Sequence, residues 1–197
     1  MSRLLYQGHG SYRFTTDKNR VIYIDPFAGG GYDKPADLVI VTHEHTDHNK
    51  VSLISFKDGG VLLRENNLLV DGKYVTYEYF GIRITGTPAS NLNHDPKKCV
   101  GVILEFDGKK IYCAGDTSTT AYMVEVLPKM HLDYAILPID GVFNMGPGEA
   151  TKCADVIGAR HSIPVHTKPG SLFDIEVAEK FTPVSRLIMH PGESITL

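Results

Sequence analysis

Short apolar or alternating runs recur along the chain and predict a protein that is rich in β-strands. Their shortness and their period of two favour strands over helices. Asp71-Gly72 and Asp107-Gly108 stand between such runs, and each dipeptide is typical of a two-residue hairpin turn. Strands are expected near residues 4–7, 12–15, 21–25, 38–42, 61–63, 68–70, 74–79, 82–85, 100–106, 110–114, 134–137, 163–165, 186–189 and 194–196.

Helical periodicity is weaker and is confined to four places. One helix is expected to begin after His48 and run toward Phe56, and a second is expected over residues 120–127, where Pro128 ends it. A third is expected over residues 148–159, whose apolar positions have helical spacing. A fourth is expected over residues 174–181, with Asp174 as its N-cap. These elements together indicate a mixed α/β protein.

The composition is that of an ordinary globular protein, and no linker divides it, so we expect one domain over residues 1–197. The net charge of −3 argues against a nucleic-acid partner held by general electrostatics. We see no signal peptide and no apolar run near the roughly 20 residues that a bilayer crossing needs. Cys99, Cys113 and Cys153 form no close pair, so we expect small core residues of a reduced, cytoplasmic protein.

The strongest chemical signal directly follows the apolar run at residues 38–42. His43, His45, Asp47 and His48 come within six residues at the end of this predicted strand. Residues two apart in an extended chain face the same way, so His43 and His45 can converge on one cation. A turn after them would carry Asp47 and His48 to an adjacent position. Imidazole and carboxylate ligands without thiolate suit zinc first, with manganese or iron as alternatives.

This segment resembles the HxHxDH signature of the metallo-β-lactamase superfamily. The resemblance extends over nearly the whole chain and is greatest to the branch of ascorbate-6-phosphate lactonase and uncharacterised metal-dependent hydrolases. It implies a four-layer αββα sandwich of two mixed sheets with helices outside. The other matching segments are Gly8-His9-Gly10, Ile24-Asp25-Pro26-Phe27, Ala114-Gly115-Asp116-Thr117, Leu137-Pro138-Ile139, Met145-Gly146-Pro147, Ile163-Pro164-Val165-His166 and His190-Pro191-Gly192-Glu193.

The resemblance implies a site for two divalent cations. His43 and His45 would bind the first cation, and Asp47, His48 and His166 would bind the second. Asp116, from the family's GDT motif, would bridge the two cations.

One ligand of the first cation departs from the usual pattern. Many relatives carry a histidine at the position of Asn91, whereas this chain has its histidine three residues later, at His94. The stretch at residues 88–96 resembles a subgroup whose loop carries the histidine late. The resemblance therefore assigns His94 as the third ligand of the first cation, with an exposed loop histidine as the alternative.

Several residues are expected around the cations rather than on them. His9 lies near the site by resemblance, with a structural core histidine as an equal alternative, and Asp25 is expected to orient a ligand histidine through its second ring nitrogen. Asn91 and Asn144 are expected to line the cleft, and Asn144 departs from the threonine often found before the methionine in relatives. Lys168 is a candidate contact for an anionic substrate group, although a solvated loop lysine is the simpler interpretation.

The implied activity is attack of a metal-bound hydroxide on a small ester, lactone or phosphoester, with Asp47 and Asp116 as the carboxylates at the reacting centre. A mononuclear iron enzyme of dioxygenase type remains open if His94 is not a ligand. A nuclease or phosphodiesterase is a weaker alternative, and a non-catalytic metal-binding domain is a third. We expect a small-molecule substrate and no membrane association, and the sequence leaves a homo-oligomer open.

Overall fold

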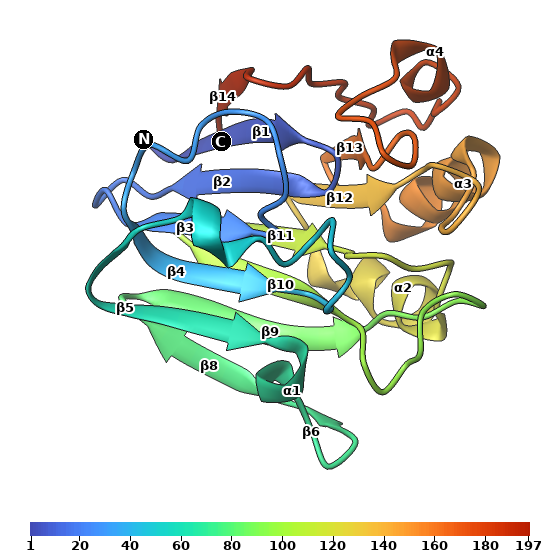
Figure 1. The fold of residues 1–197 in the computed structure, drawn as a ribbon. Coiled ribbons are helices and arrows are strands. Elements are labelled where there is room, and N and C mark those ends of the chain that lie inside the picture. The colour runs from blue at the N-terminus through green and yellow to red at the C-terminus, as the bar shows by residue number, and fades with distance from the viewer.

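The computed structural model describes residues 1–197 and contains two six-stranded sheets packed face to face (Figure 1). The first sheet has the order β14-β1-β2-β3-β4-β5. Neighbours β3, β4 and β5 are parallel, whereas the other pairs are antiparallel, so the sheet is mixed. Its strands are β1 (Arg3–Gly8), β2 (Ser11–Thr15), β3 (Val21–Ile24), β4 (Ala36–Val41), β5 (Phe56–Arg64) and β14 (Ser194–Thr196).

The second sheet has the order β13-β12-β11-β10-β9-β8 and is also mixed. Here β11, β12 and β13 run parallel, while β8 to β11 are joined antiparallel. Its strands are β8 (Thr76–Tyr79), β9 (Ile82–Pro88), β10 (Val100–Phe106), β11 (Lys109–Cys113), β12 (Tyr134–Pro138) and β13 (His161–Val165). A short ribbon of β6 (Leu69–Val70) and β7 (Lys73–Tyr74) follows the single turn of α1 (Glu65–Leu68).

The main hydrophobic core lies between the two sheets. Alternate residues of each strand point into it, as Phe14 and Ile22 do from the first sheet and Val102 and Ile136 from the second. The β4 strand is buried along its whole length, because its second face is also covered. Burial on both faces explains why this segment reads as a continuous apolar run rather than an alternating one.

Helices cover the outer face of the second sheet only. The longest, α3 (Pro147–Ile157), and the shorter α2 (Ala121–Glu125) pack on this face around a second apolar cluster (Figure 1). A 3-10 turn at Leu127–Met130 follows α2, and α4 (Ile175–Ala178) begins at Asp174, whose carboxylate accepts from two backbone N–H groups as expected of an N-cap.

The α-helix expected after His48 does not form. Only a 3-10 turn at Val51–Leu53 forms there, because the chain returns at once to begin β5 beside β4. Val51 and Ile54 pack with Tyr32 over the outer face of the first sheet, so loops cover that face in place of a helical layer. The sandwich is therefore the expected one with fewer helices.

The strand expected at residues 186–189 is also absent, since Arg186 forms only a single bridge, to Ser162. Both predicted Asp-Gly turns are confirmed. Asp107 and Gly108 have φ values of 50° and 71°, which is the left-handed pair that a type I′ hairpin requires, and Asp71-Gly72 behaves in the same way.

All three cysteines are free and buried, as the sequence predicts. Burial raises the pKa of the Cys113 thiol to about 12, so this group stays protonated and unreactive at neutral pH. None of the helices combines the length and the apolar character that a bilayer crossing requires.

The polar loops of interest all lie along one edge of the sandwich. Strands β1, β4, β9 and β12 point toward this edge, on the right of Figure 1, and β13 ends there beside β12. Because a rigid sheet fixes the ends of its strands, the loops that follow these strands can present side chains in a fixed arrangement.

Candidate metal centre

Asp116 lies at the centre of a cluster of four histidines. Its carboxylate follows β11 and is buried. Three Nε2 atoms, those of His48, His94 and His166, each lie 3.4 Å from an Asp116 oxygen, and that of His43 lies 3.9 Å away. These histidines come from the loops after β4, β9 and β13, so the predicted residues from distant parts of the chain meet in one place.

The Nε2 atoms of all four histidines are buried and make no hydrogen bond. A buried polar nitrogen without a partner costs free energy, and native proteins rarely leave several together. The same atoms are those through which imidazole binds metal ions. The donor set therefore fits divalent cations held between the histidines and Asp116.

The opposite ring nitrogen of each histidine faces a protein oxygen. Nδ1 of His48 lies 3.0 Å from Asp25 Oδ2, and Nδ1 of His43 lies 3.0 Å from Thr42 Oγ1. Thr42 donates its hydroxyl to Asp25 (2.6 Å) and its backbone N–H to the other Asp25 oxygen (2.7 Å). Asp25 thus orients His48 directly and His43 through Thr42. The sequence suggests this role for Asp25, but it does not single out Thr42.

His94 and His166 are oriented in the same manner by other loops. Nδ1 of His94 lies 2.9 Å from Asn91 Oδ1, and Nδ1 of His166 lies 3.0 Å from Asp140 Oδ2. Sequence reasoning missed Asp140, although it follows β12, which lies between the strands that carry Asp116 and His166. Its carboxylate, at the end of a predicted strand, could have marked Asp140 as a candidate site residue.

Electrostatics keep His43 and the carboxylates in the protonation states that metal binding needs. His48 differs: burial alone would lower its pKa, but Asp116 and Asp25 raise it well above its usual value, so a cation would displace a proton from this ring. Burial, and next the charge of His48, lower the pKa of His43 to about 2, so its ring is neutral. Burial alone would raise the pKa of Asp116, but the surrounding imidazoles, led by His48, lower it well below its usual range. Burial opposes ionisation of Asp140 as well, yet His166 and two backbone N–H groups lower its pKa to about 2.

Asp47 lies on the opposite side of the cluster from His94. Its Oδ2 is 3.1 Å from Nε2 of His9 and 3.9 Å from Nε2 of His166. The contact with His9 helps lower the pKa of Asp47 against the effect of burial. His9 is completely buried and its Nδ1 faces the backbone oxygen of Ser171 at 3.0 Å, so both of its nitrogens face acceptors.

Three residues of the centre have left-handed backbone conformations. His9, Asp25 and His166 have φ values of 54°, 45° and 47°. Non-glycine residues adopt this region at a cost of order 1 kcal/mol, and such strain is concentrated at functional sites. The backbone N–H of His166 donates to His9 O (2.9 Å), which ties two of these residues together.

The coordinating atoms gather in groups that could each hold a metal ion. Within each group the ligand atoms lie within 4.8 Å of one another. One group contains His43, the exposed His45 and His94. The other groups are His9, Asp47, His48 and His166, and Asp25, His43 and His48.

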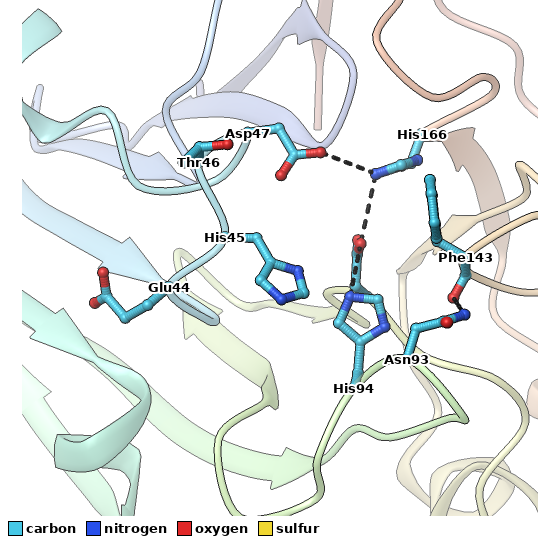
Figure 2. Close-up of a pocket in the computed structure, with 9 residues that line it drawn as sticks. Glu44, His45, Thr46, Asp47, Asn93, His94, Phe143 and His166 are labelled. Atoms are coloured by element: carbon cyan, nitrogen blue, oxygen red, sulfur yellow. Dashed lines mark hydrogen bonds and ion pairs between the residues drawn. The ribbon is translucent and has the colours of Figure 1, made fainter.

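The centre opens into a pocket of about 490 Å³ (Figure 2). His45 and Asp47 line one wall and Asn93 and Phe143 line the other, with His94 and His166 between them. An adjoining hollow of about 390 Å³ shares His45, Asn93 and His94 and also contains Lys98.

Three candidate pocket residues do not line the pocket. Lys168 pairs with Asp174 at 3.4 Å on the surface, in agreement with the simpler interpretation of a solvated loop lysine. Asn144 is buried beneath the wall, where it donates to Asp140 Oδ2 (2.8 Å) rather than facing the pocket. Asn91 likewise uses its side chain to hold His94 and the loop at Phe143.

Comparison with known proteins finds relatives over the whole chain. A model of the β-lactamase superfamily domain matches residues 3–166. A UPF0173 metal-dependent hydrolase of Thermococcus onnurineus is 32% identical, with all of both chains covered.

Solved structures show the same fold. Igni18, a metallo hydrolase of Ignicoccus hospitalis, superposes with a TM-score of 0.75 at 24% identity, covering 99% of this chain and 98% of its own. The metallo-β-lactamase fold protein YhfI of Bacillus subtilis superposes with a TM-score of 0.72 at 14% identity, with both chains covered completely. With its histidines and aspartates gathered at the sheet edge of this fold, the chain belongs to the metallo-β-lactamase superfamily, in the UPF0173 family of metal-dependent hydrolases.

Proposed function

We propose that the protein hydrolyses a small ester, lactone or phosphoester at a centre of two divalent cations. The observation that carries the proposal is the set of four buried, unpaired Nε2 atoms directed at Asp116. Zinc is our first choice for the cations because all the ligands are imidazole or carboxylate, and manganese or iron are the alternatives.

The grouping of ligands supports two positions. His43, His45 and His94 would hold the first cation, and Asp47, His48 and His166 would hold the second. Asp116 reaches members of both groups. Its Oδ2 lies near His43, His94 and His166 and its Oδ1 near His48, so its carboxylate could bridge the two positions. Two such cations, when bound, lower the pKa of water and polarise the oxygen of the bond to be broken.

The residues of the chain position the substrate and move the proton. Asp47 is half-buried at the pocket wall, and its low pKa keeps it ionised, so it would accept a hydrogen bond that positions the attacking water and would carry a proton only in passing. No cysteine lines the main pocket. Cys99 lines the adjoining hollow, where burial raises the pKa of its thiol to about 12, so it stays protonated and is a poor nucleophile.

The pocket favours a small-molecule substrate. Its volume of about 490 Å³ is in the usual range for such ligands, and Phe143 is its one apolar wall residue. No lysine or arginine lines it, so an anionic substrate group would be met by the cations or by Lys98 of the adjoining hollow rather than by Lys168.

The test combines metal analysis with activity. We expect two zinc or manganese ions per chain and turnover of model esters, lactones or phosphodiesters that is lost in Asp116→Ala and Asp47→Ala. Asp58→Ala, which removes an exposed carboxylate on β5, is the matched control and keeps full activity. A single iron with a visible absorption band would favour the redox alternative. Activity of both variants at the level of the parent protein would refute the mechanism.

A further inference from the structure

Two histidines that come from different loops are joined by a continuous chain of polar side chains. Nδ1 of His94 faces Asn91 Oδ1 (2.9 Å), and Asn91 Nδ2 donates to Asn144 Oδ1 (3.3 Å). Asn144 Nδ2 then donates to Asp140 Oδ2 (2.8 Å), which lies 3.0 Å from Nδ1 of His166. These contacts span the loops after β9, β12 and β13.

Each hydrogen bond in this series of side chains has a defined donor and a defined acceptor. Asp140 can only accept when it is ionised, so Asn144 must present its NH₂ group there and its oxygen to Asn91. Asn91 must in turn present its NH₂ group to Asn144 and its oxygen to His94. His94 is thereby held with a proton on Nδ1, which leaves its Nε2 free on the side of Asp116. At the other end, Nδ1 of His166 makes a 3.0 Å ion-pair contact with Asp140 Oδ2 that lacks hydrogen-bond alignment, and its Nε2 also faces Asp116.

Asp140 is the fixed end of the chain. Its side chain is completely buried, and its Oδ1 accepts from the backbone N–H groups of Val142 (2.7 Å), Phe143 (2.7 Å) and Asn144 (3.3 Å). These bonds shape the loop that carries Asn144. His94, in contrast, lies on a loop without regular structure, so its ring depends on Asn91 for its orientation.

We infer that Asn91, Asn144 and Asp140 form a positioning relay, through which the anchored His166 side of the centre fixes the ring of His94. The inference rests on the metal-ligand roles that we propose for His94 and His166. The relay compensates for the late position of the loop histidine, since Asn91 occupies the place of the usual ligand and acts as the acceptor that orients its replacement.

Asn144 provides the decisive test, because it touches neither histidine. Cobalt(II) affinity, measured by chelator competition, should fall about tenfold or more in Asn144→Ala, since loss of an outer partner of a metal ligand typically has this effect. Asn144→Thr retains a hydroxyl that can donate and accept, and should recover part of the loss. Asn66→Ala is the matched control, because Asn66 is an exposed asparagine on α1 that lies outside the pocket and the relay.

Coupling along the relay is tested by combining variants. Asn91→Ala and Asn144→Ala should cost less together than the sum of their separate effects, because either one breaks the same chain. In the metal-free protein, nitrogen NMR above the imidazole pKa of about 6.5 should show His94 protonated on Nδ1 in the parent and as a tautomer mixture in both variants.

The relay would be refuted by unchanged cobalt affinity in Asn144→Ala, by additive effects in the double variant, or by an equal loss in Asn66→Ala. If Asn144→Ala does not fold, Asn144→Leu serves instead, because leucine has a similar size and cannot hydrogen-bond. Cobalt affinity and a His94 tautomer equal to those of the parent in Asn144→Leu would overturn the relay. Failure of the proposed hydrolysis is a separate outcome, because metal affinity and the tautomer of His94 are measured without turnover.

Discussion

Nδ1 of His48 lies 3.0 Å from Oδ2 of Asp25, and this contact turns the opposite ring nitrogen toward Asp116. Both side chains are buried, and Asp25 also binds the backbone and hydroxyl of Thr42. The Asp25 carboxylate therefore sets the orientation of the loop that carries His43 and His48.

The first prediction concerns Asp25→Asn. Asparagine tolerates the left-handed backbone at this position, but Asp25 accepts hydrogen bonds on both oxygens and asparagine offers only one acceptor oxygen. In either orientation its NH₂ group would face a donor, at His48 or at the Thr42 backbone. We expect metal affinity to fall about 10–100-fold, as measured by chelator competition, with the fold retained. Affinity equal to that of the parent protein would show that Asp25 does not orient His48.

Gly10 offers a purely steric test of the same histidine. A Cβ atom at Gly10 would lie 2.8 Å from Cε1 of His48, which Asp25 prevents from moving away. Gly10→Ala should therefore weaken metal binding by at least about tenfold. Gly148→Ala is the control, since it adds a methyl group in open space at the start of α3 and should leave binding unchanged. Equal behaviour of the two variants would contradict this account.

Removal of metal should lower thermal stability. A ligand that binds only the folded state stabilises it by about 2.7 kcal/mol at a concentration 100 times its Kd. Chelation should therefore lower Tm, measured by calorimetry, and added zinc should restore it. In Asp116→Ala the shift on chelation should be much smaller. A Tm that does not respond to chelator in the metal-loaded parent would argue against a cation at this centre.

Asp37, which lies outside the metal centre, should make the stability of the fold depend on pH. Burial alone would raise its pKa, but Lys57, Arg20 and the backbone N–H of Val21 lower it. A lowered pKa in the folded state contributes stability that is complete above the unfolded value of about 3.9 and is lost as the pH falls through the folded value.

Asp37→Asn should therefore reduce the free energy of unfolding by about 2 kcal/mol at neutral pH, the size expected for hydrogen bonds to a charged group. The difference from the parent protein should shrink as the pH falls below about 4. Urea unfolding of both proteins across this range measures it. A difference that stays constant with pH would rule out the ion pairs as its cause.

Local sequence was sufficient to predict those features that depend only on residues near one another in the chain. The apolar run of β4 and the Asp107-Gly108 turn follow from strand burial and from the need for two left-handed residues. The grouping of His43 with His45 follows in the same way, because alternate residues of an extended chain share a side. The sandwich and the distant members of the cluster came from resemblance to a family, not from periodicity.

Tertiary structure alone decided what lies behind the ligands. Asp140 and Thr42 each follow a strand, but the local sequence does not say which ligand either one contacts. Their roles arise only because β3, β4, β12 and β13 end at one edge. Lys168 pairs with Asp174 on the surface. Only one 3-10 turn forms after His48, because the chain runs directly into β5. Sequence determined which side chains could bind a cation, because that depends on chemistry and spacing along the chain. Packing decided which partners orient them, because those partners are brought near only when the sheets form.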